Sequence, residues 1–259
     1  MTSPQLFERD QEEVRRSTEE AKKTVLRQAE VDRYLKPPSN TAYPLEYAFY
    51  LLGDARGKNI LDLGCGTGEN IIALTKHGAD RVVGMDVSPE LIALAEQRIK
   101  RTGAGAKATV KIGSAYDTSL PSESVDVIFC IALIHHLDIA AVRNEMHRIL
   151  TKNGSIVLSE PTRFSPSYAR LRNLLPERED ISDYEHPLTE DELALFTKYF
   201  DVEEKRYFRT PLLPLLARVL PFDVFEHRGF WKMDYQILRH FPIARKYATN
   251  VTVRLRKVK

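Results

Sequence analysis

Three glycines alternate with other residues in one short segment of this 259-residue chain. Residues 62–68 read D-L-G-C-G-T-G, and the apolar Ile60 and Leu61 precede them, as at the end of a buried strand. Glycine has no Cβ, so it adopts positive φ and lets a ligand press against the backbone. Apolar residues at helical spacing follow the segment. It therefore predicts a strand, a glycine turn and a helix N-terminus, which together can cradle a nucleotide-like ligand.

Two kinds of nucleotide-binding loop share this geometry. A dinucleotide fold uses G-x-G-x-x-G, and its third glycine would fall at position 69, where this chain has Glu69. The segment instead matches, at each defining position, the D-x-G-x-G-x-G loop of class I S-adenosyl-L-methionine (SAM) methyltransferases. The chain resembles this superfamily, and in particular its small-molecule branch. The resemblance implies a SAM-dependent methyltransferase; an NAD-dependent oxidoreductase and a non-catalytic SAM-binding protein remain as alternatives.

Acidic residues near the loop suit the polar parts of SAM. Asp86 ends the next expected strand, about 20 residues beyond the loop, where a carboxylate can accept hydrogen bonds from both ribose hydroxyls. Asp62 either pairs with the amino group of SAM or braces the loop through backbone amides. For adenine the family often has Gly-Asp-Ala after the third strand, whereas this chain has Ser114 and Ala115, with Asp117 as a further acid. The resemblance implies these cofactor-binding residues: Asp62, Gly64, Cys65, Gly66, Gly68, Asp86, Val87, Ser114, Ala115, Asp117 and Ile131.

Two histidines follow the fourth expected strand, on the side of a doubly wound sheet that faces its ligands. Imidazole titrates near neutral pH, so His135 or His136 could accept a proton from a hydroxyl acceptor. The string Leu-Ile-His-His-Leu resembles a Leu-His-His motif of the family, in which the histidine sometimes only packs beneath the substrate. We expect His135 to be the stronger candidate base; Glu160, which ends the fifth strand, is the second candidate, unless it anchors a loop. Because the chain has two cysteines, Cys65 and Cys130, we expect free thiols and no metal site.

An apolar stretch late in the chain is a candidate pocket for the methyl acceptor. Residues 210–216 are rich in leucine and proline, and four aromatic residues follow: Phe222, Phe225, Phe230 and Trp231. We expect a hydrophobic or aromatic small molecule as the acceptor. A cap whose apolar residues serve only its own packing is the alternative.

Strand and helix signals alternate after residue 58 and predict an α/β fold. The resemblance implies a doubly wound, seven-stranded, mostly parallel sheet with a C-terminal antiparallel hairpin, N-terminal helices and a helical cap insertion. We expect an N-terminal helical lid over residues 1–40 and a SAM-binding Rossmann-like core over 41–208, with an insertion at about 162–187. A helical cap insertion over 209–248 and a last core strand over 249–259 complete the expected organisation.

Local signals mark several element boundaries. Val125–Ile131 is almost wholly apolar and predicts a strand that is buried on both faces. Ser88, followed by a proline, predicts a helix N-cap. Thr189 and Glu192 have capping-box spacing, and we expect their helix to run to Phe200.

The composition is that of an ordinary globular protein, with 43% hydrophobic and 29% charged residues. A formal net charge of +2 gives no strong field for nucleic acid, so we expect no nucleic-acid partner. The longest apolar run, residues 127–134, is too short to span a bilayer, and the N-terminus lacks a basic-then-apolar secretion signal. We therefore expect a cytoplasmic protein whose partner is a small-molecule acceptor. The sequence leaves its oligomeric state open.

Overall fold

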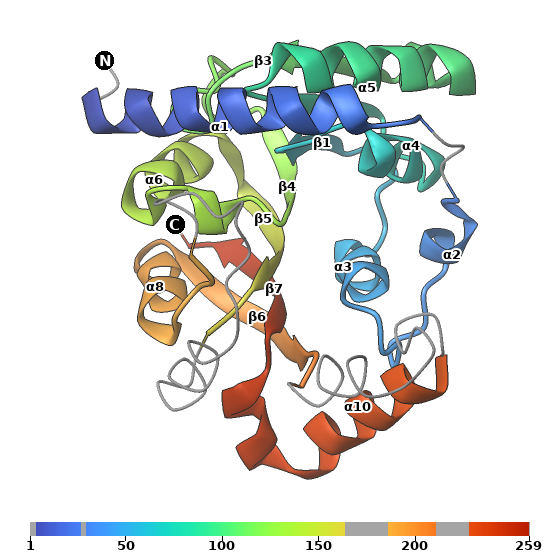
Figure 1. The fold of residues 1–259 in the computed structure, drawn as a ribbon, viewed down its shortest axis with the longest axis vertical. Coiled ribbons are helices and arrows are strands. Elements are labelled where there is room, and N and C mark those ends of the chain that lie inside the picture. Colours follow the sequence, from blue (N-terminus) through green and yellow to red (C-terminus); the bar gives the residue numbers. More distant parts are fainter. Residues whose placement is uncertain (1–3, 27–29, 164–185, 211–227, 259) are drawn as a thin grey trace.

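The computed structural model describes residues 4–26, 30–163, 186–210 and 228–258. Its seven-stranded sheet has the strand order β3-β2-β1-β4-β5-β7-β6 (Figure 1). Neighbouring strands are parallel except for β7, which runs antiparallel to both β5 and β6. The strands are β1 (Asn59–Leu63), β2 (Arg81–Asp86), β3 (Ala108–Ile112), β4 (Val125–Ile131), β5 (Leu150–Pro161), β6 (Phe200–Phe208) and β7 (Asn250–Lys257).

Helices connect the strands and begin where their capping residues predict. The Oγ of Ser88 accepts a hydrogen bond from the N–H of Leu91, and Oδ1 of Asp138 accepts one from the N–H of Ala141. The α-helices are α1 (Pro4–Lys23), α2 (Asp32–Leu35), α3 (Pro44–Leu52), α4 (Glu69–Lys76), α5 (Pro89–Thr102), α6 (Ile139–Ile149), α8 (Glu190–Ala194) and α10 (Arg228–His240). The 3₁₀ helices are η1 (Ala104–Ala106), η2 (Ile134–His136), η3 (Leu195–Lys198) and η5 (Pro242–Tyr247).

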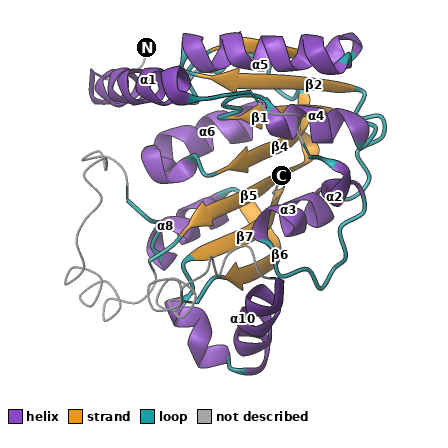
Figure 2. Cartoon of the chain, turned by 45° about the vertical axis from the view of Figure 1, so that its right-hand side comes forward, coloured by secondary structure: helices purple, strands orange, loops and turns teal. Residues whose placement is uncertain are grey.

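Two apolar clusters cover the two faces of the sheet (Figure 2). Side chains from α3, α4 and α5 pack on the face that includes Phe129, and side chains from α6, α8 and η3 pack on the face that includes Ile128. These two residues are adjacent in β4, and both are fully buried because side chains alternate along a strand. β4 is thus buried on both faces, as its apolar sequence predicts.

The expected fold class is confirmed, including the mostly parallel seven-stranded sheet and the antiparallel strand near the C-terminus. The expected helix after Thr189 is shorter than predicted. The capping box with Glu192 forms, but α8 ends at Ala194, and the chain tightens into the 3₁₀ helix η3 before β6. Most of the expected insertion at 162–187 lies outside the described residues, and so does the segment 211–227 of the expected cap.

The N-terminal helix α1 lies alongside α5 and crosses the front of the sheet in Figure 1. At the other end of the sheet, α10 lies below β6 and β7. These two helices therefore flank the edge at which the parallel strands end. Within the described residues, no helix is both long enough and apolar enough to cross a membrane.

Candidate active site

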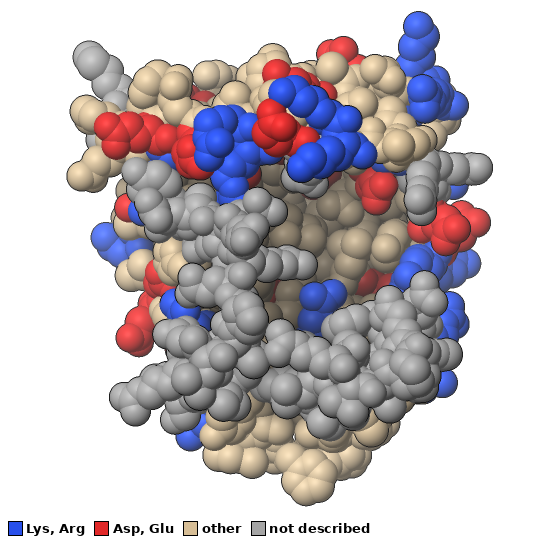
Figure 3. Space-filling view, in the orientation of Figure 1, with Lys and Arg blue, Asp and Glu red and all other residues tan. Residues whose placement is uncertain are grey.

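A cavity of about 170 Å³ lies at the carboxyl ends of the central strands, beneath α1. Its walls come from the segments that follow β1, β2, β3 and β4, and α1 covers it. Figure 3 shows this face of the molecule, where the surface is hollowed below the charged helix that crosses the top of the view. The wall residues include Gly64, Asp86, Val87, Ala115, Leu133 and His136.

The glycine loop between β1 and α4 has the backbone conformation that its sequence predicts. Gly64, Gly66 and Gly68 have φ values of +72°, +50° and +80°, a region that residues with a Cβ rarely adopt. The loop is fixed to β2, because the N–H groups of Gly64 and Cys65 both donate to the carbonyl oxygen of Met85, at 2.8 and 3.0 Å. A Cβ at Gly64 would lie 2.9 Å from both methyl carbons of Leu133. The loop therefore touches the segment after β4, while a Cβ at Gly66 would meet only open space.

Asp62 is a buried acid that the protein itself leaves unsatisfied. Its side chain is only 1% exposed, and neither carboxylate oxygen has a hydrogen-bond partner among the residues that the structure describes. Burial, together with the negative charge of Asp86, raises its pKa to about 8. Asn70 opposes this shift, although its side chain does not reach hydrogen-bonding geometry with either oxygen. A buried carboxyl group in this state is suited to a ligand that brings a hydrogen-bond donor or a positive charge.

Asp86 ends β2 at the border of the cavity and supports the glycine loop. Its Oδ2 accepts a hydrogen bond from the N–H of Gly66 at 2.9 Å, and its Oδ1 accepts one from the N–H of Ser88 at 3.0 Å. Val87 follows it in the cavity wall. The structure thus brings Asp86 and Val87 together with the loop.

The three residues expected near adenine lie in different surroundings. Ala115 lines the cavity. Ser114 accepts a hydrogen bond from the N–H of Tyr116 at 3.1 Å and faces Asp10 of α1. Burial raises the pKa of Asp10, and the hydrogen bond with Ser114 opposes that rise. Asp117 is exposed and accepts a hydrogen bond from the N–H of Ser119 at 3.1 Å, so it closes a turn outside the cavity.

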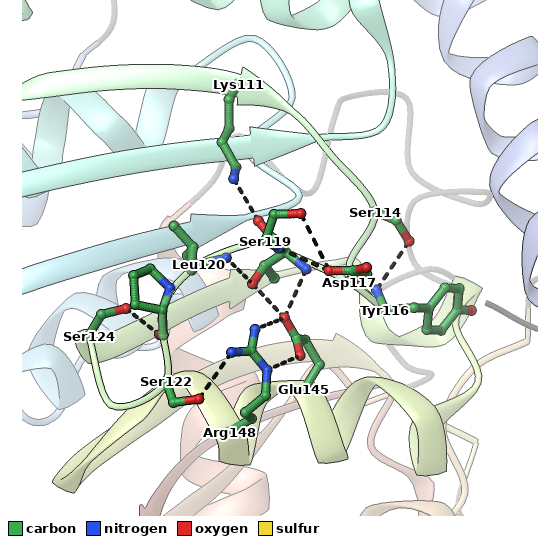
Figure 4. Close-up of polar contacts among 12 residues, drawn as sticks. Lys111, Ser114, Tyr116, Asp117, Ser119, Leu120, Ser122, Ser124, Glu145 and Arg148 are labelled. Carbon is green, nitrogen blue, oxygen red and sulfur yellow. Dashed lines mark hydrogen bonds and ion pairs between the residues drawn. The ribbon is translucent and has the colours of Figure 1, made fainter. Parts of the chain in front are cut away.

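A polar cluster behind the cavity holds the segment between β3 and β4 (Figure 4). Glu145 of α6 accepts hydrogen bonds from the N–H and the hydroxyl of Thr118, at 2.8 and 2.5 Å. Nε and Nη2 of Arg148 contact the same carboxylate at 2.8 and 2.7 Å. Burial disfavours the charged form of Glu145, but the hydrogen bonds from Arg148 and Thr118 outweigh it and lower the pKa of that carboxyl. This cluster fixes the turn that begins beside the cavity at Ser114.

Glu160, fully buried at the end of β5, organises the turn after β4. Its Oε1 accepts hydrogen bonds from the N–H groups of Leu133 and Ile134, both at 3.0 Å. Its Oε2 lies 2.9 Å from Nδ1 of His135. Because a carboxylate only accepts, Nδ1 of His135 is the donor, and Nε2 is then the nitrogen that can accept a proton. Glu160 thus fixes both the backbone of the turn and the ring of His135.

Ala132 begins this turn in a strained conformation. Its φ is +55°, which costs a non-glycine residue about 1–2 kcal/mol. Its N–H donates to the carbonyl oxygen of Ser159 at 2.9 Å, and Leu133 beside it is held by Glu160. Both Ala132 and Leu133 line the cavity. The strained backbone therefore serves to place the end of β4 against the ligand space.

The two histidines occupy different positions. His136 lines the cavity, and its Nδ1 lies 3.4 Å from Oε2 of Glu13 on α1. His135 is more deeply placed, against Glu160, and the two rings are 4.0 Å apart. No site residue was predicted in α1, which belongs to the expected N-terminal lid. Four residues of α1 line the cavity: Arg9, Asp10, Glu13 and Ser17.

The remaining residues of the expected cofactor site have supporting positions. Cys65 and Cys130 are free and buried, and burial raises the pKa of both thiols far above their ordinary value. Ile131 is partly buried against the apolar cluster that contains Cys65. Gly68 begins α4 close to α5, since a Cβ there would lie 3.0 Å from the Cβ of Ala95. Among the described residues, no group of three or more histidine, cysteine or acidic side chains is arranged to hold a metal ion.

Aromatic residues gather at the same edge of the sheet on the side of α10. The rings of Trp231 and Tyr43 are tilted by 38° with their centroids 5.0 Å apart, and Phe230 packs against the same small cluster around Trp231. Two of the aromatic residues expected in the acceptor pocket, Phe222 and Phe225, lie outside the described residues, as do residues 211–216. The structure thus describes part of the expected pocket.

Fold and site together define a class of protein. The strand order, the glycine loop after β1 and the acid after β2 are those of the class I SAM-dependent methyltransferases, and residues 60–154 match the family model of a methyltransferase domain. The matched segment, residues 60–154, thus carries a methyltransferase domain of this superfamily, whose cofactor is SAM. This assignment decides against the nicotinamide-dependent alternative.

Individual relatives match part of the chain. Norajmaline N-methyltransferase of Rauvolfia serpentina is 30% identical over 142 residues, which are 53% of this chain and 46% of that protein. Demethylmenaquinone methyltransferase of Tropheryma whipplei is 30% identical over 132 residues, 49% of this chain and 53% of that protein. The match thus spans about half the length of these curated relatives. Geranyl diphosphate C-methyltransferase of Streptomyces coelicolor A3(2) shares the fold, with a TM-score of 0.65 at 15% identity over 99% of both chains.

The residues around the cavity fit SAM. The ammonium group of its methionine part could satisfy Asp62, which has no hydrogen-bond partner among the described residues, and Asp86 in the cavity wall could accept hydrogen bonds from the ribose hydroxyls. Open space over Gly66 allows the close approach that the glycine loop predicts.

Proposed function

We propose that this chain is a methyltransferase that transfers the methyl group of SAM to a small acceptor with an apolar or aromatic body. The observation that carries the proposal is Asp62, a buried acid at the glycine loop whose carboxylate oxygens have no hydrogen-bond partner in the described part of the chain. A protein that kept this acid for folding alone would leave a desolvated carboxyl group unsatisfied, which costs about 1–3 kcal/mol. A bound cation removes that cost.

The chain's own residues act mainly by binding and placement. SAM supplies a methyl group on a positively charged sulfur. Asp62, Asp86 and the loop at Gly64 would hold the cofactor, while Leu133 and His136 form the wall on the side of β4. Placement of two reactants in contact, with water excluded by α1, lowers the barrier by about 7–11 kcal/mol in favourable cases.

His135 is our candidate for the proton acceptor when the acceptor is a hydroxyl compound. The hydrogen bond from Nδ1 to Glu160 leaves Nε2 able to accept a proton. A base in this role contributes about 10²–10⁴-fold to kcat. His136 then serves as part of the cavity wall and as a contact for Glu13 on the covering helix.

His135→Gln and His136→Gln form a matched pair that tests these roles. We expect His135→Gln to lower kcat by at least about 100-fold and to remove its rise with pH near neutrality. We expect His136→Gln to change KM for SAM and to leave the pH profile of kcat intact. The reverse pattern would assign the base to His136. If both variants kept the unmodified kcat and pH profile, proton removal by a histidine would not be part of the step.

The proposed activity itself is tested by turnover. Purified protein with SAM and a library of apolar and aromatic hydroxyl, amine and carbon acceptors should form S-adenosylhomocysteine above the rate without acceptor. Asp62→Asn serves as the variant that lacks the cofactor contact. Tight binding of SAM without turnover on any acceptor class would instead identify a non-catalytic SAM-binding protein.

A further inference from the structure

Arg209, directly after β6, has a backbone conformation that arginine rarely adopts. Its φ is +61°, in the left-handed region that favours glycine. A long, charged side chain placed there stores strain, and such strain persists only where the surrounding structure fixes it. An observed outlier of this kind points to a role for the side chain that a glycine would not supply.

The backbone of Arg209 is fixed from both sides. Its N–H donates to Oδ2 of Asp234 at 3.0 Å, and the N–H of Thr210 donates to Oδ1 of the same residue at 2.7 Å. Its carbonyl oxygen accepts hydrogen bonds from the N–H and the hydroxyl of Thr249, at 2.8 and 3.0 Å. Asp234 is buried on α10, so α10 and the start of β7 together impose the conformation.

The guanidinium group of Arg209 ends a stack of four side chains, in which two aromatic rings lie between two guanidinium groups. Its central carbon lies 5.3 Å from the centre of the Trp231 ring. The rings of Trp231 and Tyr43 are in tilted contact, and Arg33 lies 4.8 Å from the centre of the Tyr43 ring. Such contacts hold a guanidinium by its face and leave its N–H edge available.

The two arginines of this stack differ in their partners. Arg33 donates to Glu46 through Nε at 2.8 Å and contacts it through Nη2 at 2.6 Å. Arg209 has no carboxylate within hydrogen-bonding distance of its guanidinium in the described part of the chain, and both oxygens of Asp234 are taken by backbone N–H groups. Desolvation lowers the pKa of Arg209, and Asp234 only partly compensates. One end of the stack is therefore neutralised, and the other is suited to an external anion.

Arg209 lies at the edge of the sheet that also carries the candidate active site. β6 ends at Phe208 beside Asn250 of β7, and Asn250 in turn pairs with Pro161 at the end of β5. Two interstrand spacings separate β6 from β5, roughly 10 Å. Glu160, which holds His135, is the neighbour of Pro161. An acceptor of ordinary metabolite size could therefore reach both positions.

We propose that Arg209, held on the face of Trp231, binds an anionic group of the methyl acceptor, a carboxylate or a phosphate. This inference rests on the proposed function. It narrows the acceptor to a molecule with an apolar or aromatic body and one negatively charged end. The ring of Trp231, itself in contact with Tyr43, holds the guanidinium group by its face, and the N–H groups of the guanidinium fork donate hydrogen bonds to the anion.

The chain provides its own reporter, because Trp231 is its only tryptophan. We would titrate the full chain with benzoate and, separately, with inorganic pyrophosphate, at constant ionic strength, and follow tryptophan fluorescence. We expect a saturable change with at least one anion. Benzoate alone indicates a carboxylate, pyrophosphate alone indicates a phosphate, and either result supports the proposal.

Three variants assign the response to Arg209. Arg209→Gln should raise the apparent Kd at least about tenfold, and Arg209→Lys should give an intermediate value because lysine lacks the planar fork. Arg239→Gln, on the same helix as Trp231, removes the same charge and should leave the titration unchanged. Arg209→Gly should abolish the response and yet raise the melting temperature above that of Arg209→Gln, because glycine accepts φ of +61°.

Either of two results would overturn the proposal. In the first, neither anion causes a saturable change in the tryptophan fluorescence of the unmodified chain. In the second, Arg209→Gln binds the anion with the same Kd as the unmodified chain. Calorimetry with S-adenosylhomocysteine on the same samples separates this failure from failure of the proposed function. The Arg209 variants should still bind S-adenosylhomocysteine. If the unmodified chain did not bind it, that result would count against the methyltransferase proposal alone.

Discussion

The two halves of the sheet place their site residues in different ways. In the cofactor half (β3, β2, β1 and β4), four short segments at strand ends, residues 62–68, 86–88, 113–115 and 132–137, contribute most of the wall. In the acceptor half (β5, β7 and β6 with α10), the contacts join residues far apart in the chain, such as Tyr43 with Trp231. The site residues of the first half can therefore be predicted largely from local motifs, whereas those of the second half come together only through contacts between distant parts of the chain.

One backbone feature makes the contrast concrete. Gly64 and Arg209 both have left-handed φ values, +72° and +61°. At Gly64 this conformation falls on glycine, which adopts it without strain, although Ala132 in the same half adopts it at a cost. In the acceptor half it falls on arginine at a cost of about 1–2 kcal/mol, and Asp234 and Thr249 hold it in place. A local rule sets the first position, and tertiary contacts set the second.

The largest effect should come from filling the glycine loop. In Gly64→Ala the new Cβ would lie 2.9 Å from both methyl carbons of Leu133, in a conformation that alanine disfavours. We expect the Kd for SAM to rise at least about 100-fold, because overpacking and backbone strain together cost roughly 3 kcal/mol. Isothermal titration calorimetry measures the change.

Gly57→Ala is the matched control for this variant. Gly57 has the same φ, +72°, but a Cβ there meets nothing within 4 Å. Its stability should fall by about 1–2 kcal/mol from strain alone, with SAM binding preserved. If both variants lost SAM affinity equally, the loss could not be assigned to a contact between the loop at Gly64 and the cofactor.

A smaller effect should follow from Asp62→Asn. The amide cannot pair ionically with the ammonium group of SAM, so we expect a loss of about 2 kcal/mol, roughly 30-fold in Kd. An unchanged Kd would leave Asp62 as a brace for the loop. Calorimetry in buffers of different ionisation enthalpy should also show proton release on binding near pH 7 in the unmodified chain and none in the variant.

The raised pKa of Asp62 also predicts how stability depends on pH. The folded, ligand-free chain holds this proton up to about pH 8, whereas the unfolded chain loses it near its ordinary value of 3.8. Folding therefore takes up a proton between these values, and the contribution of Asp62 to stability decreases as pH rises through that window. The difference in stability between Asp62→Asn and the unmodified chain should accordingly shift in favour of the variant from pH 5 to pH 8.5. Denaturant titrations at both pH values measure this shift.

Glu160 lies where the two halves meet, and its replacement should cost less. In Glu160→Gln one amide oxygen can still accept from Leu133 and Ile134, but the NH₂ group then faces Nδ1 of His135, which must become an acceptor. We expect a loss of about 1–2 kcal/mol in the free energy of unfolding. Nε2 of His135 then carries the proton, so methyl transfer to hydroxyl acceptors should slow more than cofactor binding weakens. If the rate of methyl transfer and the affinity for SAM fell by the same factor, Glu160 would act on cofactor binding and not on the orientation of His135.

The smallest effect should come from Asp234→Asn. Its amide can keep the contacts with Thr210 but not the acceptor for the N–H of Arg209. We expect a loss of about 1 kcal/mol in stability, with the Kd for SAM within about twofold of the unmodified value. A parallel loss of cofactor affinity would show that the two halves are coupled through α10.

What the sequence could predict follows the same division. The left-handed glycines, the cap at Ser88 and the strand Val125–Ile131 depend on neighbours a few residues away, and the sequence predicted them. The expected helix to Phe200 was too long, because the chain tightens into η3 to start β6.

Several site residues gave no local signal. The strained Arg209 is neither glycine nor asparagine, so its conformation could not be read from residue type. Glu13 approaches His136 only because α1 folds back over the strand ends, a contact between residues more than a hundred positions apart. The partners of Arg209, Asp234 and Thr249, lie 25 and 40 positions further along the chain.

The most direct test of the account is calorimetric titration of the folded full chain with SAM and with S-adenosylhomocysteine, at pH 6.5 and pH 8.5. We predict one saturable site for each ligand. SAM should bind more tightly at the higher pH, because Asp62 must lose its proton to pair with the ammonium group of the ligand. The absence of binding heat for both ligands at both pH values would contradict it.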